Sequence, residues 1–247
     1  MSASTMATQL LMSRNRLLAA LPDDERAKLA IDLARVRLVQ GEVLFDPDER
    51  PNHVYFPLTG MISLVAPMND GAAVEVATIG PEGAVNLIQG LGTGCVFWRA
   101  IVQIPGEALR IERARLQAIR AGSEAMRAVV GRYTEAFLVQ ILQLVACNAL
   151  HAVEARLARW LLASRDCVGD DRLPLTQEFL AEMLGVNRTT VTQAARDLQR
   201  AKLIAYRRGQ VRILDRAGLE HAACECQGRI RRGFDALLPP IVAVTCS

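Results

Sequence analysis

The sequence lacks the features that mark several protein classes. Its six cysteines in 247 residues are too sparse and too unevenly spaced for a disulfide framework, so we expect reduced thiols. The most apolar stretch, residues 136–153, is interrupted by glutamine, asparagine and histidine and does not predict a membrane span. Arg14 and Arg16 break the apolar piece near the N-terminus, which excludes the core of a secretory signal. We therefore expect a cytoplasmic protein with no membrane partner.

No group of residues suggests catalysis. The three histidines, His53, His151 and His221, lie far apart in sequence and have no nucleophile or metal ligand at motif spacing. We therefore do not expect an enzyme. The chain is 51% hydrophobic, which is enough for two modest cores, or for one core and an oligomer interface.

The most informative segment is residues 175–193, whose spacing predicts two short helices joined at a glycine. Thr176 is placed to cap the first helix and Asn187 the second, and Gly185 supplies backbone freedom for a tight turn. Apolar residues at helical spacing predict the buried faces, formed by Leu180, Met183 and Leu184, and by Val191, Ala194, Ala195 and Leu198. We interpret the segment as a helix-turn-helix that enters the major groove of double-stranded DNA. A helical hairpin with a solvated polar face is the alternative.

A basic β-hairpin follows this segment. Residues 202–214 contain two strand-like runs around a turn at Gly209, which predicts a β-wing. Between Val186 and Arg216 there are eight basic residues and only two acidic ones, whereas the whole chain has a net charge of +3. The positive charge is therefore concentrated in the segment that would contact DNA phosphates. A basic face that contacts only water is the usual alternative.

Residues 21–123 are expected to form a β-rich domain, after an N-terminal extension of residues 1–20. A helix is expected from about Asp23 to Leu33. Alternating runs separated by glycine, proline or asparagine turns predict strands at residues 41–45, 53–58, 61–65, 74–79, 100–104 and 108–111. Short, evenly spaced strands of this kind predict a jelly roll, a fold that encloses a pocket.

A long helix is predicted for residues 124–152. A heptad seam runs along it, through Met126, Val130, Tyr133, Phe137, Gln140, Leu144, Cys147 and His151. We expect this seam to pair with its copy in a homodimer, because helix-turn-helix proteins commonly use two-fold symmetry to read paired half-sites. Burial within one chain is the alternative. The polar seam positions Gln140 and His151 are interpreted as register-setting or merely tolerated, in preference to a pH-sensing role for His151.

The remaining residues are assigned to a winged helix-turn-helix domain, 153–216, and a C-terminal extension, 217–247. The extension contains Cys224 and Cys226, two soft metal ligands, with His221 nearby and Cys246 farther on. The usual two-residue spacing and a second ligand pair are missing, so we expect these cysteines to pack without a metal or cofactor. Thiol or metal sensing through Cys224 and Cys226 is the alternative.

Taken in order, these parts predict an α+β chain that resembles the Crp/Fnr superfamily of bacterial transcription regulators over nearly its whole length. The most specific matches are the helix-turn-helix, Gly-Glu-Val-Leu-Phe at residues 41–45, and the run at residues 54–64. The resemblance implies a homodimer that binds a roughly palindromic operator and contacts RNA polymerase. It also implies that a signal in the jelly roll reorients the recognition helices.

Mapped residue by residue, the resemblance implies a set of DNA contacts. Phosphate contacts fall on Thr176, Gln177, Asn187 and Thr190, and base-reading positions on Arg188, Thr189, Thr192 and Gln193. The wing adds Arg207 and Arg208 as expected phosphate contacts. Thr189 and Gln193 stand where the two best-known members have a glutamate and an arginine, so those members' half-sites do not carry over.

The signal pocket departs from the family pattern. Val85 stands about where cyclic-nucleotide-binding members place the carboxylate for the ribose, and Arg99, near the phosphate position, is followed by Ala100 instead of serine or threonine. A buried phosphate would lose its charge-assisted hydrogen bonds. We therefore expect neither cyclic AMP nor cyclic GMP to bind, and we expect Arg99 to lie on an exposed loop. The N-terminal cysteine cluster of iron–sulfur members is also missing.

Several functions stay open at this point. The first is a DNA-binding regulator with an unidentified small-molecule effector or with none. The others are a cyclic-nucleotide-dependent regulator with an altered pocket, the thiol or metal sensor, and a regulatory subunit of an enzyme. The helix-turn-helix argues against the last. The sequence does not identify the effector, the operator or the direction of regulation.

Overall fold

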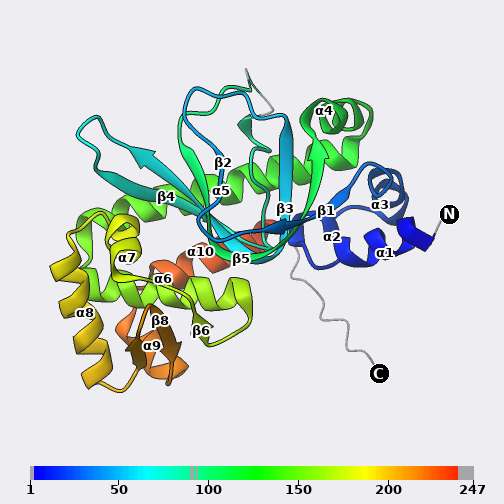
Figure 1. Cartoon of the computed structure of the whole chain (residues 1–247). Helices are drawn as coiled ribbons and strands as arrows, with labels where there is room; N and C mark the ends of the chain where they lie inside the picture. The colour runs from blue at the N-terminus through cyan, green and yellow to red at the C-terminus, as the bar shows by residue number, and fades with distance from the viewer. Residues whose placement is uncertain (1–2, 90–91, 93, 239–247) are drawn as a thin grey trace, which may run out of the picture.

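The chain forms two regions joined by one long helix (Figure 1). The computed structural model describes residues 3–89, 92 and 94–238. A β-rich region comes first, helix α5 (Glu124–Leu150) runs behind its sheet, and a smaller sheet with its own helices follows. The predicted combination of a jelly roll, a long helix and a winged helix-turn-helix in an α+β chain is confirmed.

Three short helices precede the larger sheet: α1 (Ala3–Met12), α2 (Arg16–Ala19) and α3 (Asp23–Leu29). Asn15 attaches them to the jelly roll. Its side-chain oxygen caps α2 by accepting a hydrogen bond from the Leu18 N–H at 3.1 Å. Its amide donates to the carbonyls of Pro57 and Gly83, at 2.9 and 2.8 Å. The N-terminal segment is therefore part of the same core.

The larger sheet is antiparallel and has the order β1-β5-β3-β4, with β2 also paired to β5. Its strands are β1 (Ala34–Leu38), β2 (Val43–Phe45), β3 (His53–Pro67), β4 (Ala73–Ile79) and β5 (Arg99–Glu112). Strand β1 was not predicted. The expectation that Arg99 lies on an exposed loop was wrong, because Arg99 is the first residue of β5.

Two long strands replace four predicted short ones, and glycines explain why. Turns are expected from the sequence at Thr59-Gly60 and Pro105-Gly106, but the structure has register shifts there within the antiparallel pairing of β3 and β5. A Cβ at Gly60, which has φ +83°, would lie 2.6 Å from the Ile104 carbonyl oxygen, and one at Gly106 would lie 2.2 Å from that of Thr59. The glycines therefore allow close backbone contact and leave the strands continuous.

Helix α4 (Arg113–Gly122) leads into α5, whose predicted heptad seam faces the interior of its own chain. Met126, Tyr133, Phe137 and Leu144 are all at most 5% exposed. The Tyr133 hydroxyl lies 3.1 Å from the Ala84 carbonyl, to which it donates. The expectation that this seam pairs with a second copy was wrong. A heptad pattern specifies an apolar stripe on a helix but not what covers it.

A different stripe of α5 is bare. Leu138, Leu142 and Val145 are 53%, 61% and 63% exposed. By length and composition α5 could cross a membrane. Its opposite face, however, packs on the jelly roll and on α10, as expected for a core helix.

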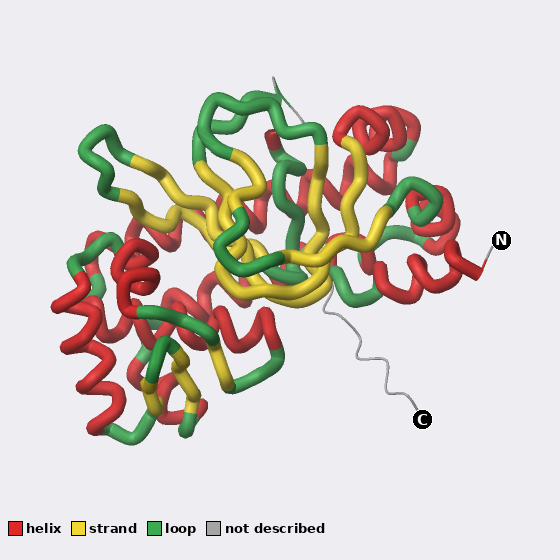
Figure 2. Tube along the Cα trace, in the orientation of Figure 1, coloured by secondary structure: helices red, strands yellow, loops and turns green. Residues whose placement is uncertain are grey.

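The C-terminal region centres on α6 (Val153–Val168), whose Trp160 and Leu161 are fully buried. Around it lie β6 (Arg172–Leu173), α7 (Gln177–Leu184), α8 (Arg188–Arg200), β7 (Ile204–Arg207), β8 (Gln210–Ile213) and α9 (Arg216–Ala222). The three strands form a small antiparallel sheet of order β6-β8-β7. Figure 2 shows this sheet apart from the larger one, with α8 at the outer edge.

Helix α10 (Cys226–Leu237) leads the chain back to α5. The ring of Phe234 lies 6.5 Å from that of Tyr133, measured between centroids. Arg16 Nη1 forms an ion pair with Asp235 at 2.9 Å, and Arg16 Nη2 donates to the Phe234 carbonyl at 2.9 Å. The C-terminal extension thus joins the N-terminal segment to the long helix.

Candidate nucleic-acid interface

Helices α7 and α8 form the predicted helix-turn-helix. The Thr176 hydroxyl accepts a hydrogen bond from the Phe179 N–H at 3.2 Å, and the Asn187 side chain accepts one from the Thr190 N–H at 3.3 Å. Between the helices Gly185 has φ +61°, in the left-handed region that favours glycine. The predicted inward residues of both helices are buried. Both caps and the turn are confirmed.

The outer face of α8 presents polar side chains to solvent. Arg188, Thr189 and Gln193 are exposed, and Thr190 and Thr192 are half-buried. The Asn187 side-chain oxygen also accepts hydrogen bonds from the Thr189 and Thr190 hydroxyls, at 2.9 and 2.7 Å. The structure therefore brings the predicted residues at the start of α8 together in one capping network.

Two predicted base-reading side chains have partners that the sequence analysis missed. Arg188 Nη1 lies 2.6 Å from Glu178 Oε1, and the Gln193 amide donates to both carboxylate oxygens of Asp197, at 3.1 and 3.0 Å. An exposed ion pair contributes only about 0.2–1 kcal/mol, whereas a bidentate arginine–guanine contact contributes about 1–3 kcal/mol. Arg188 can therefore exchange Glu178 for a base. These partners could have been suspected from the sequence, because Glu178 and Asp197 lie within ten positions of Arg188 and Gln193.

The wing is a tight hairpin of β7 and β8, with Ile204 opposite Ile213. Arg208 and Gly209 form its turn, with φ +50° and +73°, as a two-residue hairpin loop requires. A recess of about 320 Å³ separates the wing from the helix-turn-helix, and it is lined by Thr176, Gln177, Glu178, Arg188, Tyr206, Arg208 and Gly209. Four predicted DNA contacts therefore surround one hollow, along with Tyr206, which was not predicted.

Tyr206 is half-buried beside this recess. Burial raises the pKa of its hydroxyl, and the nearby Glu178 carboxylate raises it further. The phenol therefore stays protonated and can donate a hydrogen bond to a phosphate oxygen.

The jelly roll contacts the helix-turn-helix directly. A Cβ at Gly185 would lie 2.9 Å from Val74 Cγ2, which places the β4 end of the β3–β4 hairpin against the turn. Nearby, the indole N–H of Trp160 on α6 donates to the Glu75 carboxylate at 3.0 Å. Glu75 is 4% exposed, and burial raises its pKa to about 7. The jelly roll and the C-terminal region therefore share one packed junction at β4.

Comparisons with known proteins agree with this architecture. Residues 35–123 match the cyclic nucleotide-binding domain family and residues 155–222 match the Crp-like helix-turn-helix domain family, which together cover more than half of the chain. The chain belongs to the Crp/Fnr superfamily. This is a family of transcription regulators.

Individual relatives of this Crp/Fnr chain are distant in sequence. The global nitrogen regulator of Synechococcus elongatus is 22% identical over 221 residues, which span 85% of this chain and 98% of the relative. The structure of FixK2 from Bradyrhizobium japonicum is 18% identical, with a TM-score of 0.65 over 78% of this chain and 98% of that one. The c-di-GMP responsive regulator CLP from Xanthomonas campestris is 16% identical, with a TM-score of 0.64 over 78% and 100%.

The residues expected near a cyclic nucleotide, Val85 and Arg99, have partners within this Crp/Fnr chain. Val85 is fully buried, and its backbone forms a bridge with Tyr55 through hydrogen bonds of 3.1 and 2.8 Å. Arg99 Nε pairs with Asp46 Oδ1 at 2.6 Å. The Arg99 guanidinium, expected near a cyclic phosphate, thus has a carboxylate partner, and both side chains are partly exposed.

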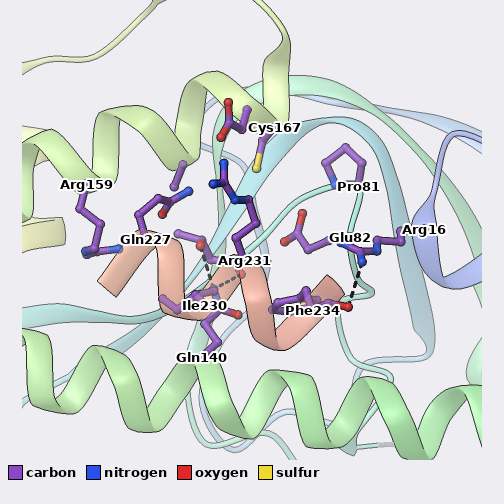
Figure 3. Close-up of a pocket in the computed structure, with 13 residues that line it drawn as sticks. Arg16, Pro81, Glu82, Gln140, Arg159, Cys167, Gln227, Ile230, Arg231 and Phe234 are labelled. Atoms are coloured by element: carbon purple, nitrogen blue, oxygen red, sulfur yellow. Dashed lines mark hydrogen bonds between the residues drawn. The ribbon is translucent and has the colours of Figure 1, made fainter. Parts of the chain in front are cut away.

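A cavity of about 290 Å³ lies elsewhere, between the jelly roll, α5, α6 and α10 (Figure 3). Arg16, Arg159 and Arg231 line it together with Glu82. Figure 3 shows Arg231 extending from α10 toward Cys167 on α6. Arg159 is 4% exposed, and its Nε has no hydrogen-bond partner among the described residues. The cavity lining thus combines apolar side chains with three arginines and the carboxylates of Glu82 and Asp166.

The cysteines of the extension do not pair with His221. His221 Nδ1 lies 2.7 Å from the Ala217 carbonyl, on the exposed side of α9. Cys224 and Cys226 instead meet Cys147 and His151 at the end of α5, 75 to 77 positions away in sequence. Spacing alone could not reveal this group, because its halves are distant along the chain. Cys246 lies outside the described residues.

Proposed function

We propose that this Crp/Fnr chain is a homodimeric, sequence-specific DNA-binding transcription regulator that does not respond to cyclic AMP. One observation carries the proposal: the outer face of α8 and the wing form a single exposed surface with a local excess of positive charge. The proposed phosphate contacts are Thr176, Gln177, Asn187, Thr190, Arg207 and Arg208. The proposed base contacts are Arg188, Thr189, Thr192 and Gln193.

The exposed stripe of α5 supports the homodimer. Leu138, Leu142 and Val145 follow steps of four and three, which is the spacing of a heptad seam. An apolar stripe along a long helix lowers its free energy by pairing with a second copy. Two-fold pairing would present two α8 helices to successive major grooves. We propose this stripe as the dimer contact in place of the seam first expected.

Two places in the molecule bear on which effector it binds: the expected cyclic-nucleotide position and the cavity beside Arg159. Val85 supplies no carboxylate for the ribose of a cyclic nucleotide, and Ala100 follows Arg99 in place of a serine or threonine that would hold the phosphate, which argues against cyclic AMP and cyclic GMP. The cavity beside Arg159 has the charge to hold a small anion at the junction of the two regions. We propose that a small-molecule effector would act there.

The remaining elements of the proposal follow from DNA binding. A regulator works where the chromosome is, so we propose a cytoplasmic location, with RNA polymerase as a further partner. The domain division remains the one expected from the sequence, at residues 1–20, 21–123, 124–152, 153–216 and 217–247.

Genome-wide mapping of bound DNA with the purified protein tests the proposal. We expect the recovered fragments to share a roughly palindromic motif whose half-sites lie about 10–10.5 base pairs apart or a multiple of that. Affinity for this motif should fall with added salt and exceed affinity for random DNA by about 10³-fold or more. Fragments without a common motif would contradict sequence-specific binding.

A further inference from the structure

Four potential metal ligands from two distant segments meet where α5 ends. Cys147 and His151 are one helical turn apart on α5, and Cys224 and Cys226 flank the start of α10. One ligand atom from each residue lies within 4.8 Å of the others. All three cysteines are at most 8% exposed. Thiolate and imidazole ligands in this number are typical of a closed tetrahedral site.

The distances within the group fit a single ion. Cys147 Sγ lies 3.5 Å from Cys224 Sγ, and Cys226 Sγ lies 3.5 Å from His151 Nδ1. Zinc bond lengths imply separations of about 3.8 Å between two sulfurs and about 3.5 Å between a sulfur and a nitrogen in a tetrahedron. An iron–sulfur cluster divides its four protein ligands between two or more irons and would spread them farther apart than one shared ion does. The geometry therefore favours a mononuclear site.

Surrounding groups orient these ligands. His151 Nε2 lies 3.3 Å from the Glu225 carboxylate, so its N–H donates there and leaves the Nδ1 lone pair directed at the cysteines. The Gln143 amide donates a hydrogen bond to Cys226 Sγ at 3.1 Å. Ordinary packing of cysteines requires neither a histidine held in one tautomer nor an amide that donates to a cysteine sulfur.

Buried positive charge on α6 lies close enough to offset the charge of three metal-bound thiolates. Arg156 and Arg159 on α6 are at most 6% exposed and act on this group electrostatically. Three thiolates and one divalent cation leave a net charge of −1, which a buried guanidinium offsets.

We propose that Cys147, His151, Cys224 and Cys226 bind one thiophilic divalent metal ion of the zinc class. Binding exchanges the thiol protons, which pass to solvent, for metal–sulfur bonds, without a change in oxidation state. The site is distinct from the cyclic-nucleotide position and from the predicted DNA contacts.

The position of the site gives the metal a structural role. Helix α6 begins two residues after His151, and Arg156 on α6 donates to the Leu184 carbonyl at the end of α7, at 2.5 Å. A metal that ties α5 to the start of α10 would fix this junction. We therefore expect metal to stabilise the fold and to change operator affinity. The second effect rests on the proposed function, whereas metal binding does not.

Titration of the reduced, metal-free full-length protein with Co²⁺ tests the proposal. We expect one equivalent to bind, with the intense visible bands of tetrahedral cobalt and a thiolate-to-cobalt charge-transfer band, both lost on adding Zn²⁺. Cys147→Ser and Cys226→Ser should abolish these bands. The matched controls Cys95→Ser and His221→Ala should retain them, because both residues lie outside the group.

Glu225→Ala is a milder variant, since Glu225 is exposed and is not a ligand. We expect metal affinity to fall about 10–100-fold with the fold intact. Substoichiometric binding by the wild type, an octahedral cobalt spectrum, or unchanged affinity in Cys147→Ser would overturn the site. These readouts need no DNA, so a protein that binds metal but no operator would contradict only the proposed function.

Discussion

The two long faces of α5 have the same apolar character but different surroundings. The inner face is covered by β4 and α10, and its polar Gln140 donates to the Thr78 carbonyl at 3.0 Å. The outer face presents Leu138, Leu142 and Val145 to solvent. Covered apolar surface stabilises this chain, whereas bare apolar surface marks a place for a partner. The buried junction around Glu75 and the exposed face of α8 differ in the same way: the first stabilises the chain, and the second is open to a partner.

The largest effect is expected on the inner face. Phe137→Asp should lower the free energy of unfolding by at least about 3–5 kcal/mol, because it removes a buried ring and buries an unpaired charge. Denaturant unfolding measures this. The neighbouring Leu138→Asp is the matched control, and at a protein concentration low enough to keep the chain monomeric it should leave stability nearly unchanged, because Leu138 is 53% exposed in the single chain. Equal losses at the two positions would remove the distinction between the faces.

The outer face should control association. We expect Leu138→Asp combined with Leu142→Asp to weaken dimerisation at least about tenfold, since four carboxylates would meet across the two-fold contact. Sedimentation as a function of concentration measures this, with Ile31→Asp, another exposed apolar position, as control. If the wild type itself sediments as a monomer at micromolar concentration, the stripe is not a dimer contact.

Stability at the buried junction should depend on pH through Glu75. The carboxyl has a pKa of about 7 when folded and about 4.5 when unfolded, so the folded state keeps its proton between these values. The free energy of unfolding should therefore fall by about 3 kcal/mol as pH rises from 4.5 to above 7.

Glu75→Gln should remove most of this decline, because the amide cannot ionise. Unfolding at pH 5 and pH 8 compares it with the wild type and with Glu135→Gln on the exposed side of α5. A decline in Glu75→Gln as steep as in the wild type would show that another group is responsible.

The smallest effect is expected on the exposed surface of the helix-turn-helix. Arg188→Ala should cost about 1–3 kcal/mol on the operator and relax specificity at one base, whereas Arg207→Ala should weaken all DNA similarly and reduce the salt dependence. Fluorescence anisotropy on operator and random duplexes measures both, with Arg115→Ala on α4 as control. Equal losses on both duplexes for Arg188→Ala would make it a phosphate contact.

The sequence determined the features that depend on near neighbours. Thr176, Gly185 and Asn187 specify the helix-turn-helix because a cap or a left-handed turn needs only the backbone within four residues. The wing turn at Gly209 is local in the same sense. These elements, and the exposed positions of the proposed DNA contacts, could be predicted for that reason.

The tertiary structure decided which surfaces meet. Periodicity identified an apolar seam on α5, but only the return of α10 showed that the seam is covered and that Leu142 is bare. It likewise gave Cys224 and Cys226 the partners Cys147 and His151 in place of His221. Contacts between segments more than 70 residues apart depend on the whole path of the chain, since no local pattern records which of several apolar or thiol-bearing faces will be its neighbour.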